Sequence, residues 1–121
     1  MNQAKPIENT AADASAQWQD ICSLESIIPN SGVCALVNDK QIAVFRIGQS
    51  EEIYAIDNYD PIGHANVLSR GIIGDIQGEL VVASPLYKQH FSLKSGQCLE
   101  EAEVKLNTYP ARVHQGKVQI S

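Results

Sequence analysis

The chain has 121 residues, of which 44% are hydrophobic, and this size and composition fit one globular domain with a modest core. Its net charge is −5, and the nine Lys and Arg residues form no cluster, which argues against nucleic acids and anionic membranes as partners. No apolar run approaches the roughly 20 residues that span a bilayer.

The N-terminal segment 1–17 is rich in Ala, Asn and Gln and poor in aromatic and β-branched residues. This composition predicts a flexible tail, with a weak amphipathic helix over Thr10–Gln17 as an alternative. The segment has neither the basic start nor the apolar centre of a secretory signal. Cys22, Cys34 and Cys98 stand isolated, which is typical of thiols buried in a core within a reducing compartment, so we expect a cytoplasmic protein.

We expect the ordered domain over residues 18–121. Alternating apolar residues in Trp18–Cys22 predict a strand, and Ser23–Ile28 a helical turn capped by Ser23. The apolar segments that follow are short and separated by turn residues, and they predict strands over Val33–Val37, Gln41–Ile47, Ile53–Asp57, Gly71–Ile73, Leu80–Ala83, His90–Leu93, Leu106–His114 and Lys117–Ile120. Gln115-Gly116 favours a hairpin turn between the last two. The chain is therefore predicted to be all-β, a sandwich or barrel.

Two irregular segments, Asn58–Gly71 and Ala83–Cys98, each carry proline and small residues beside a strand end. In this pattern the chain resembles the Rieske [2Fe–2S] family, in which the first loop carries Cys-x-His and the second Cys-x-x-His. The residues that match the frame of these loops are Asn58, Pro61, Gly63, Leu68, Gly71, Pro85, Phe91, Leu93 and Gly96. The resemblance implies a Rieske-like (ISP domain) fold of antiparallel sheets over residues 18–121, with a small two-loop subdomain at about 58–96.

The four positions that the resemblance assigns to cluster ligands hold Asp60, Ile62, Ser84 and Tyr87. Iron and bridging sulfide need thiolates on one metal and imidazoles on the other. Isoleucine has no donor atom, and the hydroxyls of serine and tyrosine ionise too weakly to replace a thiolate. We therefore expect no cluster, no metal and no catalytic residue in this chain.

Within the Rieske-like set, the chain is most similar to the small-subunit family of cytoplasmic, NAD(P)H-dependent assimilatory nitrite reductases. The segments that carry this similarity are Trp18–Cys22, Gly32–Leu36, Asp60-Pro61, Val67–Ile72, Gln77–Leu80, Val82–Leu86 and Gly96–Glu100. The resemblance implies a non-catalytic subunit that docks onto a large catalytic subunit. That partner carries FAD, siroheme and a [4Fe–4S] cluster and reduces nitrite to ammonium, because the cofactors supply the chemistry.

The loop tips are the expected docking surface. Its candidate residues form an apolar and aromatic patch flanked by two cations, and they are Pro61, Ile62, His64, Leu86, Tyr87, Arg70 and Lys88. An alternative is that Ile62, Leu86 and Tyr87 turn inward and fill the volume that a cluster would occupy.

Two other functions remain open at this point. The first is a Rieske-type ferredoxin that passes electrons to an oxygenase or reductase. The second is a small metal-binding protein or stand-alone enzyme that uses His64, His90 and Cys98, although their spacing does not match a ligand motif.

Overall fold

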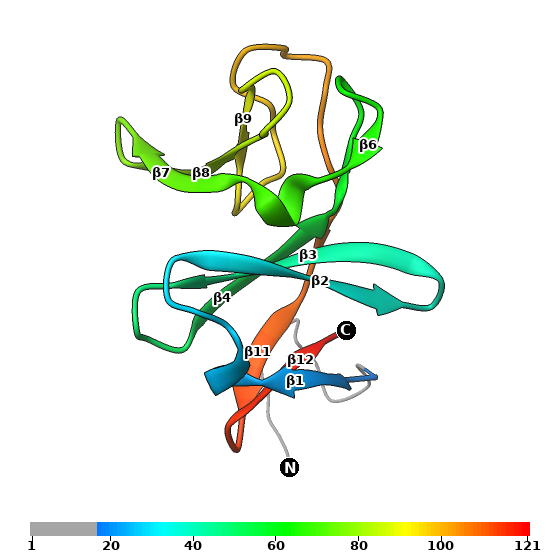
Figure 1. Ribbon diagram of the computed structural model, residues 1–121, viewed down its shortest axis with the longest axis vertical. Coiled ribbons are helices and arrows are strands. Elements are labelled where there is room, and N and C mark those ends of the chain that lie inside the picture. The colour runs from blue at the N-terminus through cyan, green and yellow to red at the C-terminus, as the bar shows by residue number, and fades with distance from the viewer. Residues whose placement is uncertain (1–16) are drawn as a thin grey trace.

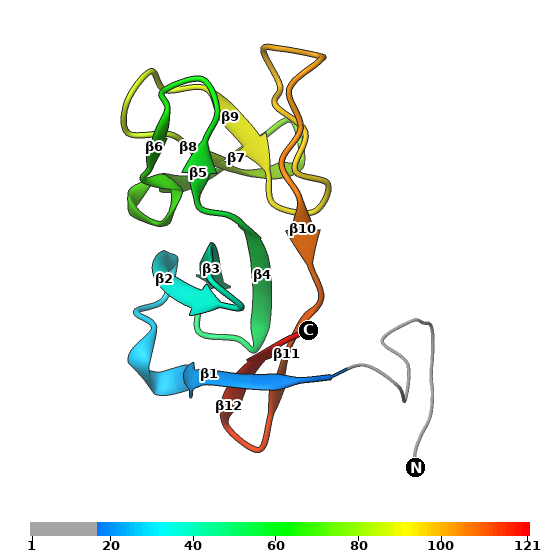
Figure 2. The same cartoon turned by 90° about the vertical axis from the view of Figure 1, so that its right-hand side faces the viewer.

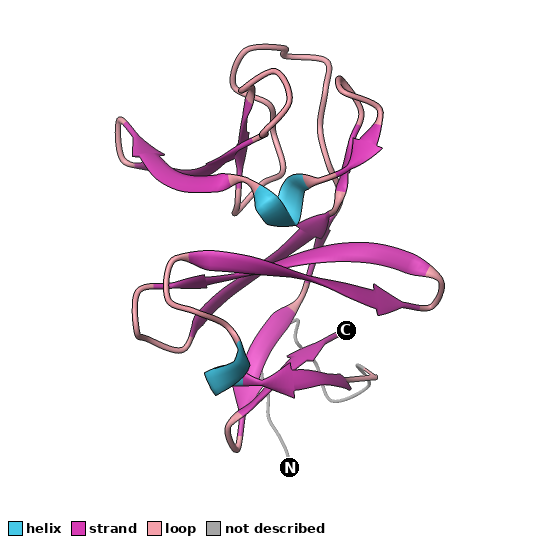
Figure 3. Ribbon diagram, in the orientation of Figure 1, coloured by secondary structure: helices cyan, strands magenta, loops and turns pink. Residues whose placement is uncertain are grey.

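A computed structural model describes residues 17–121, so the tail expected over 1–17 lies outside the described residues, apart from Gln17. The described chain consists of short strands, two single-turn 3-10 helices and loops (Figures 1 and 3), which confirms the all-β prediction. The strands are β1 (Gln19–Ser23), β2 (Ser31–Val37), β3 (Lys40–Ile47), β4 (Glu52–Asp57), β5 (Tyr59–Asp60), β6 (Ala65–Asn66), β7 (Ile72–Ile76), β8 (Glu79–Ala83), β9 (His90–Ser92), β10 (Thr108–Tyr109), β11 (Ala111–His114) and β12 (Lys117–Ile120). The 3-10 helices are η1 (Leu24–Ser26) and η2 (Leu68–Arg70). No helix among residues 17–121 has the length and apolar character needed to cross a membrane.

All strand pairs are antiparallel, and they form two halves of the molecule (Figure 2). In one half, the four-stranded sheet β10-β4-β3-β2 packs over the three-stranded sheet β1-β12-β11. In the other half lie the three-stranded sheet β7-β8-β9 and the small hairpin β5-β6.

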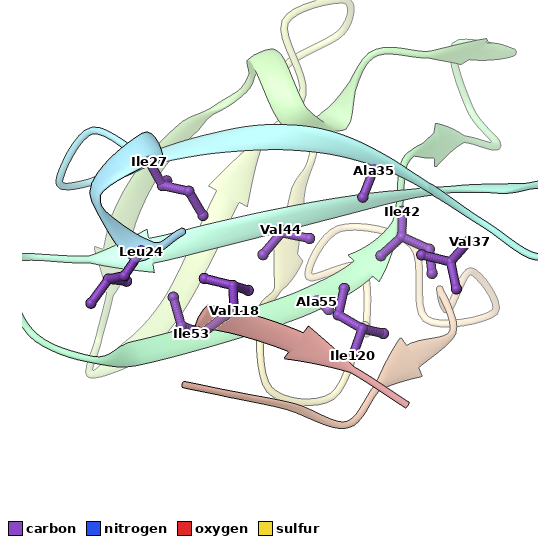
Figure 4. Packing of buried hydrophobic residues seen from close by; sticks show 10 residues of the cluster. All are labelled: Leu24, Ile27, Ala35, Val37, Ile42, Val44, Ile53, Ala55, Val118 and Ile120. Atoms are coloured by element: carbon purple, nitrogen blue, oxygen red, sulfur yellow. The ribbon is translucent and has the colours of Figure 1, made fainter. Parts of the chain in front are cut away.

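The first core lies between the four-stranded sheet and the β1-β12-β11 sheet (Figure 4). Alternation along β2 turns Ala35 and Val37 into this core and leaves Cys34 and Leu36 exposed on the outer face. The prediction that all cysteines point into a core is therefore wrong for Cys34. Cys98 is buried and Cys22 packs against the first core, as expected.

The second core joins the halves, because it combines one face of the four-stranded sheet with the strands of the loop subdomain. Its buried members are Ala43, Phe45, Ile56, Leu68, Val82, Phe91, Leu93, Cys98 and Leu106. Strand β3 therefore buries both faces, which explains its nearly continuous apolar sequence. At Gly32 the backbone of β2 passes so close that a Cβ would lie 2.7 Å from the Phe45 ring.

The C-terminal hairpin confirms one turn prediction and corrects one strand. Gln115 and Gly116 have φ values of 52° and 78°, as the tight turn between β11 and β12 requires. The strand expected over Leu106–His114 is instead two strands, because Pro110 has no N–H to donate and interrupts the ladder: β10 pairs with β4, and β11 pairs with β12.

The predicted cap at Ser23 is also wrong, since its hydroxyl lies 2.8 Å from the Ser26 hydroxyl and accepts no amide of η1.

Candidate docking site at the paired loops

Asn58 fixes the base of the first loop, and its side chain is 1% exposed. Its Oδ1 accepts the Ser69 amide at 2.7 Å, and its Nδ2 donates to Gln41 Oε1 at 3.0 Å. Its backbone carbonyl accepts the Leu68 amide at 3.1 Å. One buried amide side chain thus ties both ends of the loop to each other and to strand β3.

The first ligand position of each loop has the same local hydrogen bond. The Ile62 amide donates to Asp60 Oδ1 at 2.8 Å, and the Leu86 amide donates to Ser84 Oγ at 3.3 Å. In both loops, a side-chain oxygen therefore accepts the amide two residues further along. This hydrogen bond defines an Asx turn at Asp60 and the equivalent serine turn at Ser84.

The backbone also follows the same path in both loops. The Asp60 carbonyl accepts the His64 amide at 2.7 Å, and the Ser84 carbonyl accepts the Lys88 amide at 3.1 Å. His64 and Lys88 adopt the left-handed conformation, with φ values of 59° and 65°. The two loops are therefore structural counterparts that present their side chains in a related way.

Buried side chains join the two loops. Ser84 Oγ donates to Asp60 Oδ2 at 2.5 Å, and these two residues are 1% and 0% exposed. The Gly63 amide adds a second backbone hydrogen bond to Asp60 Oδ1 at 3.0 Å. Beside this pair, the Leu86 side chain packs on Gly63, where a Cβ would lie 2.5 Å from Leu86 Cδ1.

The residues at the four ligand positions do not fit an iron–sulfur cluster. The oxygens of Asp60 and Ser84 bind each other and backbone amides, Ile62 packs against the second core, and Tyr87 is 66% exposed. None of these groups is the thiolate or imidazole that such a cluster requires. Among residues 17–121, no group of three or more His, Cys, Asp or Glu side chains is arranged to hold a metal ion.

His64, His90 and Cys98 each have a different environment. His64 Nδ1 lies 3.3 Å from the Tyr59 hydroxyl, and His90 Nδ1 lies 2.7 Å from Glu100 Oε2. Cys98 is 1% exposed, and burial raises the pKa of its thiol. In the described part of the chain, the three residues form no common centre.

Glu100 accepts two hydrogen bonds from His90, the backbone amide at 2.8 Å and the ring at 2.7 Å. Burial raises the pKa of this carboxyl group, but the hydrogen bonds from His90 outweigh that effect and lower the pKa overall. Because its pKa is lowered in the folded state, the ionised Glu100 stabilises the fold at pH values above 4.5, the ordinary pKa of Glu. This contribution is lost as the pH falls below that value. The pair connects β9 to the loop that follows it.

We therefore expect Glu100→Gln to lower the Tm at neutral pH, with a difference from wild type that disappears as the pH falls through the acid range below about 4. Thermal unfolding followed at a series of pH values measures this difference. Glu103→Gln, on the same acidic loop and also exposed, is the matched control. A Tm difference for Glu100→Gln that stays constant across the pH range would contradict this explanation.

The structure places most of the predicted interface residues at the loop tips. Tyr87 is 66% exposed and Leu86 43%, His64 and Lys88 are exposed, and Pro61 is half-buried. The exposed and half-exposed residues around these tips are here called the loop-tip surface, which comprises Tyr59, Pro61, His64, Leu86, Tyr87 and Lys88.

The loop-tip surface differs from the predicted docking surface at three residues: Ile62 and Arg70 do not belong to it, and Tyr59 does. Ile62 turns toward the second core, so the inward, volume-filling alternative describes Ile62, whereas Tyr87 faces solvent. Arg70 is exposed but lies on η2, which packs beside β2 and β3 at the junction of the halves (Figure 3). Tyr59, 43% exposed, was not predicted; it alternates with Asn58 and Asp60, whose burial is visible only in the structure.

Known proteins share both the sequence and the fold. A family model described as "Rieske-like [2Fe-2S] domain" matches residues 17–121. The nitrite reductase (NADH) small subunit of Escherichia coli K12 is 50% identical over 105 residues, which cover 87% of this chain and 97% of that protein. The solved structure of the E. coli protein NirD is 50% identical, with a TM-score of 0.81, over 86% of this chain and 94% of that chain.

A second kind of relative is much longer. The nitrite reductase [NAD(P)H] large subunit of Klebsiella oxytoca is 43% identical over 106 residues, which cover 88% of this chain but 11% of that protein. Because the family match extends over residues 17–121 and the small-subunit relative shares half of the aligned residues, this chain belongs to the Rieske-like [2Fe-2S] domain family.

Proposed function

We propose that this chain is the small, non-catalytic subunit of a cytoplasmic nitrite reductase [NAD(P)H], and that it assists the reduction of nitrite to ammonium by docking onto the large catalytic subunit. The observation that carries the proposal is the 50% identity to a nitrite reductase small subunit over 97% of that protein's length. FAD, siroheme and a [4Fe–4S] cluster belong to the large subunit in this proposal, and they supply the redox chemistry.

The Klebsiella relative supports the choice of partner. A segment similar to this chain forms 11% of a protein that is itself named a nitrite reductase large subunit. In that protein, the two parts are covalently joined and remain at high effective concentration. Separate chains that act together need a docking surface to achieve the same proximity.

The loop-tip surface is the docking surface in this proposal. It combines exposed aromatic and aliphatic groups, Tyr59, Leu86 and Tyr87, with cationic Lys88. Aromatic anchors surrounded by polar groups are typical of the energetically important part of protein interfaces. A buried hydrogen bond joins the two loops beneath this surface, and a preformed surface loses less entropy on binding.

The alternative of a Rieske-type ferredoxin requires a cluster that the donor set does not fit. Asp60 and Ser84 offer oxygens that already bind each other, and Ile62 offers no donor. Electrons would then pass within the large subunit, and this chain would contribute structure rather than a redox centre.

Co-expression of a tagged form of this chain with the siroheme-containing large subunit tests the proposal. We expect the two chains to co-purify, and nitrite-dependent NAD(P)H oxidation to fall when this chain is omitted. The chain purified alone without air is expected to be colourless and free of iron. Failure to associate, together with unchanged nitrite reduction, would refute the proposal, whereas stoichiometric iron with visible absorption would support the ferredoxin instead.

A further inference from the structure

The hydrogen bond between Asp60 and Ser84 joins two loops that are 24 residues apart in the sequence. We propose that this buried pair is a cross-loop tie that takes the mechanical place of a metal cluster and positions the loop-tip surface, so that the surface forms without iron. The link from this tie to partner binding rests on the proposed function. The tie itself concerns only the two loops.

The Asp60 carboxylate is satisfied on both oxygens. Its Oδ1 accepts the amides of Ile62 and Gly63 at 2.8 and 3.0 Å, and its Oδ2 accepts the Ser84 hydroxyl at 2.5 Å. A fully buried carboxylate is stable only when hydrogen bonds replace its lost hydration. The residue therefore depends on contacts from both loops, and the loops are connected through it.

Ser84 transmits the same constraint into the second loop. Its hydroxyl donates to Asp60 and accepts the Leu86 amide at 3.3 Å, while its carbonyl accepts the Lys88 amide at 3.1 Å. Leu86 and Lys88 flank Tyr87 on both sides. The orientation of this exposed tyrosine thus depends on a hydroxyl that is itself buried.

Asp60 and Ser84 are 0% and 1% exposed, so neither can touch a partner directly. They are positioning residues that act through the backbone of Ile62, Leu86 and Lys88. In proteins that bind a cluster, the metal closes such loops and couples their order to metal loading. In this chain, the hydrogen bond between Ser84 and Asp60 joins the two loops.

Hydrogen exchange of the isolated chain tests the tie. Ser84→Ala removes the bridging hydroxyl, and we expect the amides of Ile62 and Gly63, which bind Asp60 in the other loop, to exchange about tenfold faster or more, because a buried hydrogen bond to a charged group is lost. Ser84→Cys keeps a similar volume with a weaker donor and is expected to give a smaller increase, which keeps the test readable if Ser84→Ala does not fold.

The chain offers a matched control in the same half. Ser92 is 2% exposed and its hydroxyl donates to the Glu79 carboxylate, so Ser92→Ala removes the same kind of contact without separating the two loops. We expect Ser92→Ala to leave exchange at Ile62 and Gly63 near the wild-type rate. If the Ser84 variants accelerate these amides no more than Ser92→Ala does, the tie is refuted.

Binding to the cofactor-loaded large subunit separates this inference from the proposed function. We expect Ser84→Ala to weaken binding about fivefold or more, although Ser84 is buried, while Ser92→Ala binds as wild type does. If the wild-type chain does not bind at all, the proposed function fails, and the exchange data alone decide the tie. If Ser84→Ala binds as wild type while its loops exchange faster, the positioning role in docking is refuted.

Discussion

Tyr87→Asp is expected to weaken the association with the large subunit about 30-fold or more, because an aromatic anchor in an interface commonly contributes ~2 kcal/mol or more. Tyr87 is 66% exposed at the tip of the second loop, so a charged residue there costs the isolated fold little. In a desolvated interface, the same carboxylate would be buried without a partner. A titration of the tagged chain against the cofactor-loaded large subunit measures the change in Kd.

Leu36→Asp is the matched control for this prediction. Leu36 is 71% exposed on β2, in the half of the molecule that does not carry the loops. We expect it to bind the large subunit as wild type does. Unchanged affinity for Tyr87→Asp combined with a lower Tm would show instead that Tyr87 supports the subdomain, and the docking surface would have to lie elsewhere.

Phe45→Ala is expected to reduce the free energy of unfolding by about 3–5 kcal/mol, the usual cost of removing a fully buried aromatic side chain. Phe45 is 0% exposed and belongs to the second core, which joins the four-stranded sheet to the loop subdomain. The ring also lies against Gly32, and strand β3 packs beside η2, so we expect the backbone to collapse little into the space that the ring leaves. Urea unfolding measures the loss.

Phe45→Leu is the graded control, since it keeps much of the apolar volume and is expected to cost about 1.5 kcal/mol or less. Hydrogen exchange shows where the fold is weakened. We expect Phe45→Ala to accelerate exchange in β8 and β9, which belong to the second core, more than in β12, which belongs to the first. A loss below about 1 kcal/mol for Phe45→Ala would show that the halves do not depend on this ring.

In the role proposed above, contacts between side chains take the mechanical place of a cofactor in this domain. The second core fixes the base of the loops, Asn58 closes the first loop, and Asp60 and Ser84 connect the two tips. In this proposal, the subunit supplies a preformed surface to its partner, and its contribution does not depend on the supply of iron.

The sequence by itself determined the class of the fold and the chemistry that the loops lack. Alternation and turn residues placed the strands β2, β3, β4 and β12 correctly, because side-chain period and turn conformation are local properties of the chain. The turn at Gln115-Gly116 is encoded in the same way. The absence of ligand chemistry at Ile62 also follows from the residue itself.

Only the tertiary structure decided what the loops do instead. The contact between Asp60 and Ser84 depends on how two distant segments dock, and no local pattern encodes that geometry. The same reason applies to Cys34, whose exposure depends on which face of β2 meets a core, and to Arg70, which lies on η2 rather than at the tips. Local pattern sets which side chains alternate, whereas long-range packing sets what each of them faces.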